Sequence, residues 1–163
     1  MDEHHLLNLN PQKLIRCLDR ILDSNELQKI TDAIHENVQQ LVNLSRSHLR
    51  FAELAVGRSS WRQRVSRSYY CAYCMSRAVR LTASGYYNTD PTDHKKIGDL
   101  PTGFPDKSIW EDFLIKFKGD RNLADYDHTV SERALELTSH QYLAETQRFY
   151  QASRSYLTAR GVI

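Results

Sequence analysis

The segment Trp61–Thr82, WRQRVSRSYYCAYCMSRAVRLT, predicts the central helix of this protein. Apolar and small side chains recur in it at steps of three and four residues, and it contains neither Gly nor Pro. Ser59 or Ser60 stands before it as a helix cap, and Gly85 follows as a stop signal. No window of the chain alternates apolar and polar residues with a period of two, so we expect an all-α protein.

Four further helices are expected around this segment. They are a short helix from Pro11 to about Leu22, a long one from Asn25 to about Val56, one that opens at Asp106 and breaks at Gly119, and a last one from Val130 or Ser131 to near Tyr156. Together these five main helices predict an up-and-down bundle that forms a single domain over residues 1–163.

One long irregular connection, Gly85–Pro105, interrupts the helical pattern. It holds three of the six glycines and three of the four prolines. A connection of about 20 residues is longer than usual in a compact domain. Within it, residues 91–97 can form one short helical turn that presents His94 and the lysines after it, or the whole stretch is a plain surface loop.

Composition places the chain among single soluble domains. It has 163 residues, of which 40% are hydrophobic and 26% charged, and no apolar run approaches the roughly 20 residues needed to cross a bilayer. The start of the chain has no cationic leader, and three cysteines do not make a disulfide framework. We therefore expect a cytoplasmic protein without a membrane segment, in which Cys71 and Cys74 are buried thiols on a helix face.

Positive charge is concentrated in residues 46–80. This segment carries eight arginines and no lysine, against Glu53 as its one acidic residue. Two interpretations stay open: the guanidinium groups bind phosphate or carboxylate, or they cover a solvated helix face and pair with acidic neighbours in the fold. The arginines are Arg46, Arg50, Arg58, Arg62, Arg64, Arg67, Arg77 and Arg80.

A second concentration of ionisable groups lies in Gly119–His128, and no phosphate-binding glycine loop, metal-ligand spacing or nucleophile motif occurs elsewhere. If residues 121–128 are helical, Arg121 and His128 share a face. Such a pair binds a phosphate and moves a proton near neutral pH, which suits RNA because its 2′-hydroxyl lies beside the scissile phosphate. The alternative is that Arg121 and Asp125, four residues apart, form an ordinary helical ion pair.

Three short motifs resemble those of the HEPN family, the helical domains of prokaryotic toxin–antitoxin, CRISPR and antiviral systems. Residues Arg67–Ala78 are similar to the R-x-Y-Y-A-x-x-x-x-x-R-A pattern of that family, and His94-Lys95 stands where its members often have a His-Lys pair. The run Arg121–Tyr126 resembles its R-x-x-A-D-Y element. The similarity covers about residues 45–156, and residues 1–44 look like an added helical portion.

The resemblance implies a helical bundle that forms a homodimer and, in active members, a metal-independent endoribonuclease without cofactor. Carried over to this chain, the catalytic residues are Arg121, Asn122 and His128, with two copies of the arginine and the histidine in one cleft. Further residues are expected to contribute to binding; these are Tyr126, Asp125, Arg67, Tyr70, His94 and Lys95. For Tyr69 and Tyr70 two roles stay open, packing in the core or dimer interface and stacking on bases.

The expected function is therefore RNA binding, with cleavage in active members, in a toxin–antitoxin or antiviral defence setting. The alternative is a non-catalytic module that docks a nucleotidyltransferase partner or binds a nucleotide.

Overall fold

The computed structural model describes residues 22–85 and 91–163. These residues form α3 (Ser24–Leu54), α4 (Trp61–Ser84), α5 (Lys107–Tyr126) and α6 (Ser139–Thr158), with the short 3₁₀ helices η1 (Arg58–Ser60), η2 (Pro91–Lys96) and η3 (Glu132–Ala134). The all-α prediction is confirmed for this part of the chain, which contains no strand. The helix expected from Pro11 lies outside the described residues except for its final position.

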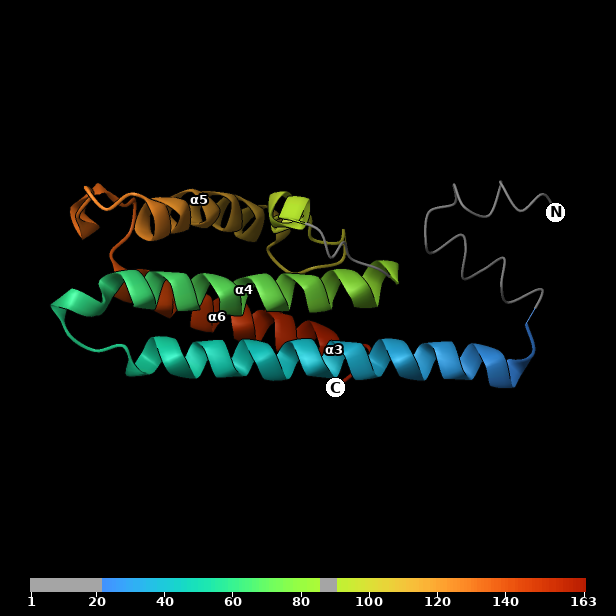
Figure 1. Cartoon of the computed structure of the whole chain (residues 1–163). Helices are drawn as coiled ribbons and strands as arrows, with labels where there is room; N and C mark the ends of the chain where they lie inside the picture. The colour runs from blue at the N-terminus through green and yellow to red at the C-terminus, as the bar shows by residue number, and fades with distance from the viewer. Residues whose placement is uncertain (1–21, 86–90) are drawn as a thin grey trace.

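Helix α4 is the centre of the bundle. It lies between α3 and α5, and α6 packs against it from behind in the view of Figure 1. Because neighbours surround it, α4 is buried on most of its circumference rather than along one stripe. Tyr69, Met75 and Val79 of α4 are almost fully buried, together with Phe117 of α5 and Phe149 of α6. The segment that predicted the central helix therefore does form it.

Helix α3 begins with a reciprocal cap. Asp23 accepts hydrogen bonds from the backbone of Asn25 and Glu26, and the Glu26 carboxylate accepts one from the Asp23 backbone. The fully buried residues of α3 begin only at Val38, and its earlier turns extend beyond the end of α4 (Figure 1). The packing of α3 against the bundle is therefore concentrated in its second half.

Two expected boundaries around α5 and α6 are wrong. Gly119 does not break its helix, because a glycine costs only about 1 kcal/mol inside a helix and the buried side chains of Asp120, Arg121 and Ala124 follow it. The last helix begins at Ser139 rather than near residue 130, since Thr138 forms a capping box with Gln141. The intervening residues contain η3 instead.

The connection after α4 is tied to that helix by one buried carboxylate. Asp93 in η2 is 0% exposed and lies 2.8 Å from Arg77 and from Arg80. The Tyr73 hydroxyl also donates a hydrogen bond to it, at 2.9 Å. The short helical turn expected in this connection is thus confirmed, and it is anchored on α4.

Two smaller sequence expectations concern the thiols and the membrane. Cys71 and Cys74 are free and buried on α4, and burial raises the pKa of the Cys71 thiol to about 12. They match the predicted inert thiols. Within the two described ranges, every helix is too short or too polar to span a bilayer.

Candidate functional site

Helices α4 and α5 and the turn η2 bring an arginine and a histidine to the same pair of tyrosines. Tyr69 and Tyr70 are adjacent on α4, with their rings edge to face at 5.7 Å. The Arg121 guanidinium of α5 lies over both rings, at 5.4 and 5.1 Å from their centres. His94 of η2 contacts the same two rings, at 5.9 and 6.3 Å. We call Tyr69, Tyr70, His94 and Arg121 the Arg121 cluster.

Arg121 is held in place by polar and aromatic neighbours. One terminal nitrogen donates to the Tyr70 hydroxyl at 2.6 Å, and Nε lies 2.7 Å from a carboxylate oxygen of Asp125 without the alignment of a good hydrogen bond. The other terminal nitrogen reaches Asn122 at 3.2 Å and the Tyr126 hydroxyl at 3.5 Å. Burial disfavours the charged form, but Asp125 together with Tyr70 and Tyr126 outweighs it, and the pKa of Arg121 is raised. The cation is therefore permanent and oriented.

His94 is positioned by contacts with α4. Its Nδ1 lies 2.9 Å from the Tyr69 hydroxyl, and its ring stacks on Tyr73 with centres 4.1 Å apart. Burial lowers the pKa of His94, and the positive charges of Arg121 and Arg77 lower it further. The imidazole is thus neutral at pH 7 and able to accept a proton.

A groove of about 340 Å³ adjoins this cluster between the first half of α4 and the end of α5. It is lined by Arg62, Gln63, Ser66, Arg67, Tyr70, Ala124 and Asp125. His48 of α3 stacks on Tyr70 at 5.5 Å, and its Nδ1 lies 3.4 Å from a terminal nitrogen of Arg67. The groove thus offers the Arg67 cation and a partly exposed aromatic ring, which are the kinds of group that bind single-stranded nucleic acid.

Half of the arginines of residues 46–80 serve the fold rather than a surface. Arg62 donates to three backbone carbonyls at the end of α5 and beyond, those of Ala124, Asp127 and Val130, at 2.6 to 2.8 Å. Arg64 is buried and donates to Ser139 at 2.7 Å and to the carbonyl of Ala55. Arg77 and Arg80 bind Asp93, as described above. The exposed members are Arg46, Arg50, Arg58 and Arg67.

The helical face that was expected to join Arg121 and His128 does not form. Helix α5 ends at Tyr126, and Asp127 caps it in an extended conformation. Asp127 then accepts hydrogen bonds from the backbone and the hydroxyl of Thr129, so the chain turns there. His128 lies in this turn, exposed to solvent. The imidazole that shares the tyrosine pair with Arg121 is that of His94.

The other predicted site residues divide into two groups. Asn122, Asp125 and Tyr126 contact Arg121, and Tyr70 bonds to it, so these four belong to one constellation. Arg67 lines the adjoining groove. Lys95 of η2 is exposed, in contrast to the buried Asp93 in the same turn. For Tyr69 the packing role holds, since it is 1% exposed, whereas Tyr70 is only partly covered.

Sequence reasoning missed His48 and Asp93. The helical spacing does place His48 on the core-facing side of α3, but nothing local to it indicates stacking on Tyr70. For Asp93 a signal was present: Arg77 and Arg80 are three residues apart on one face of α4 and require an anion. Which acidic residue supplies it depends on how the connection returns to the helix.

The described ranges contain no group of three or more His, Cys, Asp or Glu side chains placed to hold a metal ion. A scan of protein-family models found no model that matches the chain, and searches of curated proteins and of solved structures found no match either.

Proposed function

We propose that this protein binds single-stranded RNA at the Arg121 cluster and its groove, and cleaves it there by attack of the 2′-hydroxyl on the neighbouring phosphate. One observation carries the proposal: an oriented guanidinium and a neutral imidazole contact the same tyrosine pair. Arginine and histidine at one site are the minimum for binding a phosphate and moving a proton. HEPN-like activity of this kind is what the sequence motifs imply.

In the proposed reaction His94 is the general base. It accepts the proton of the 2′-hydroxyl while the 2′ oxygen attacks phosphorus, and the bond from phosphorus to the 5′ oxygen breaks. The leaving oxygen takes a proton from solvent, and the product end is a 2′,3′-cyclic phosphate. Arg121 stabilises the negative charge that builds on the phosphate oxygens in the transition state.

Binding would come from the groove. Arg67 faces the phosphate backbone there, and the rings of Tyr70 and Tyr126 offer surfaces on which bases stack. Tyr126 is 74% exposed, so its ring is available without any rearrangement.

The decisive test is RNA cleavage in the presence of a metal chelator. We expect His94→Gln and Arg121→Lys each to lower the rate about 10²- to 10⁴-fold. His128→Ala and, as a matched control, His35→Ala on α3 are expected to leave it unchanged. If the wild type cleaves and only His128→Ala is inactive, His94 is not the base. If no variant changes the rate, the site is wrongly placed.

A second candidate is a non-catalytic module, and the burial of Arg121 favours it. The side chain is only 9% exposed and paired with Asp125, as in a structural ion pair. In this function the cluster stabilises the bundle, which docks a nucleotidyltransferase partner or binds a nucleotide in a toxin–antitoxin setting. Capture of a nucleotidyltransferase together with RNA affinity that does not depend on salt would favour it.

A further inference from the structure

Two surfaces of this chain outside the Arg121 cluster are complementary in charge, and both carry apolar side chains. One is an apolar ridge on α3, and the other is an acidic groove between α5 and α6. The ridge lies on the outer side of α3, whereas the groove lies between two other helices that both pack against α4 (Figure 1). One molecule therefore cannot join its own two surfaces.

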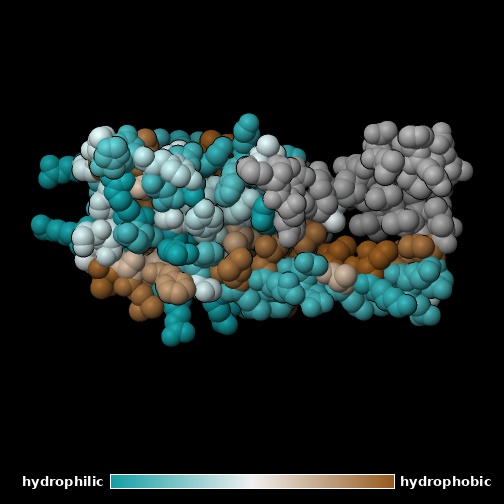
Figure 2. All heavy atoms as spheres, in the orientation of Figure 1, coloured by the Kyte–Doolittle hydropathy of each residue, from teal (hydrophilic) through white to brown (hydrophobic). Residues whose placement is uncertain are grey.

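The ridge is formed by side chains on the side of α3 that faces away from the core. Leu44, Phe51 and Leu54 share this side, and Val56 follows just beyond the helix. Their exposed fractions run from 49% for Leu44 to 75% for Val56. Figure 2 shows apolar surface at the end of the molecule where α3 finishes. Four large apolar residues in one place are more than scattered surface residues explain.

Positive charge borders this ridge. Arg50 lies beside it, Arg46 lies one turn earlier on the same side, and Arg58 follows Val56; all three are exposed. The nearby carboxylate of Glu53 accepts a hydrogen bond from Gln147 of α6 at 2.8 Å. The ridge therefore presents apolar side chains with a cationic margin.

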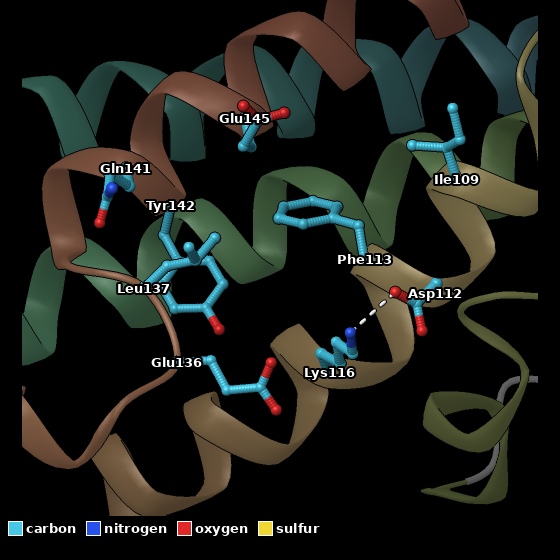
Figure 3. Close-up of a pocket in the computed structure, with 9 residues that line it drawn as sticks. All are labelled: Ile109, Asp112, Phe113, Lys116, Glu136, Leu137, Gln141, Tyr142 and Glu145. Atoms are coloured by element: carbon cyan, nitrogen blue, oxygen red, sulfur yellow. Dashed lines mark ion pairs between the residues drawn. The ribbon is translucent and has the colours of Figure 1, made fainter.

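The groove has the opposite charge. It encloses about 330 Å³, and Ile109, Phe113, Leu137 and Tyr142 form its apolar part (Figure 3). Its lining carries three carboxylates against one ammonium group, that of Lys116, which pairs with Asp112 at 2.9 Å. Glu145 pairs with Arg148 at 2.9 Å, and Glu136 supplies the third carboxylate. Within the described part of the chain, no cation lies at ion-pair distance from Glu136.

We propose that the groove of one molecule takes the α3 ridge of a second copy of this chain, with Arg50 and its neighbours facing Glu136. The cavity has room for one large apolar side chain such as Phe51 or Leu54. A nucleic acid does not fit the acidic groove, because like charges repel. The contact joins two different surfaces, so it is head-to-tail, and association continues until a ring closes. The area of one ridge in one groove is small, so we expect weak, salt-sensitive association.

The test uses two variants that each lose one surface. Arg50→Glu/Leu54→Ser breaks the ridge, and Ile109→Ser/Glu136→Lys breaks the groove; Lys29→Glu, an equal charge change elsewhere on α3, is the matched control. Each protein is first freed of nucleic acid. Analytical ultracentrifugation then measures the mass of the assembly at increasing protein concentration. We expect wild type and control to associate, each double variant alone to be monomeric, and an equal mixture of the two variants to form dimers and nothing larger.

Several outcomes would overturn the proposal. A wild type that stays monomeric at every concentration excludes the contact. A mixture that stays monomeric while the wild type associates points to a two-fold interface instead. The charge matching can also be tested with the wild type alone. Association that is equally strong at about 0.1 M and about 0.5 M salt would exclude it. A monomeric wild type whose ridge binds anionic vesicles assigns the ridge to a membrane surface. None of these results depends on RNA cleavage, so the two proposals fail separately.

Discussion

Two arginine–aspartate clusters of the described residues lie beside different tyrosines of α4 and differ in what surrounds the carboxylate. Asp93 is 0% exposed and receives Arg77, Arg80 and the Tyr73 hydroxyl. The Asp125 side chain is 21% exposed and receives one guanidinium, that of Arg121. The first carboxylate is enclosed by donors, whereas the second is partly exposed and lines a groove.

The difference indicates which cluster holds the fold and which is available to a ligand. Two guanidinium groups surround the buried Asp93 carboxylate, and each of these charges is stabilised by the others. A ligand has no access to this cluster. An arginine whose only carboxylate is partly exposed can exchange that carboxylate for a phosphate. The predictions below test this contrast, beginning with the largest expected effect.

Removing the buried charge is expected to cost the most. Asp93→Asn leaves two arginines on α4 without their carboxylate, and we expect the free energy of unfolding to fall by about 3–5 kcal/mol. Urea unfolding measures this loss. Asp99→Asn, an exposed aspartate of the same connection, is the control and should change stability by less than about 0.5 kcal/mol. An equal, small effect of both variants would refute the structural role of the Asp93 cluster.

Truncating the exposed ring beside Arg121 is expected to act on binding rather than on stability. Tyr126→Ala should weaken RNA affinity by about 1–3 kcal/mol, because a stacking surface is lost. Fluorescence anisotropy with a labelled single strand measures the affinity. Ile115→Ala removes an apolar side chain of α5 that is also mostly exposed, and it should leave the affinity unchanged. If Tyr126→Ala loses stability but keeps its RNA affinity, the ring stabilises the fold and does not contribute to binding.

We expect the free energy of unfolding to fall as the pH is lowered below 6.5. His94 and His48 both have pKa values lowered from 6.5, mainly by burial. In this range the unfolded chain therefore binds more protons than the folded one, and stability falls as the pH is lowered. Urea unfolding at about pH 7 and about pH 5.5 measures the difference, which His94→Gln should reduce. A stability that rises on acidification would contradict the assigned burial of these imidazoles.

A smaller loss of stability is expected at the pair of Arg121 and Asp125, whose side chains are 10% and 21% exposed. Asp125→Asn leaves the mostly buried Arg121 guanidinium without its carboxylate, so it should cost more than the ~0.2–0.5 kcal/mol of an exposed i, i+4 pair but less than Asp93→Asn. It also removes negative charge beside the groove, so we expect RNA affinity to increase. Glu111→Gln, which breaks the more exposed pair with Lys107 on the same helix, should cost less stability and leave affinity constant. Lower affinity in Asp125→Asn would mean that Asp125 orients Arg121 for binding.

Local patterns predicted α3 and α4 within a few residues. In each, apolar spacing and a terminal glycine or turn agree on the same boundaries. The expected serine cap of α4 does not form, because the Ser60 side chain makes no capping hydrogen bond. The patterns failed where local preference and packing disagree. Gly119 has a poor helix propensity, yet α5 continues because Asp120, Arg121 and Ala124 are buried against the bundle.

The composition of the candidate site was predictable, but its assembly was not. Helical spacing can relate Arg121 only to residues of the same helix. It therefore indicated Asp125 and His128 as the neighbours of Arg121. The end of α5 at Tyr126 excludes a shared helical face. His94 reaches the tyrosines beside Arg121 through a connection that is anchored by Asp93. Such a contact between distant segments leaves no trace in periodicity.

The side chain of Arg62 has a consequence for engineering this protein. The turn after α5 looks suitable for a peptide tag or an inserted domain, since His128 and Thr129 are exposed and polar. Yet one guanidinium from α4 binds the carbonyls of Ala124, Asp127 and Val130 together. Added residues there would separate those carbonyls, so the turn is a poor acceptor for insertions despite its exposure.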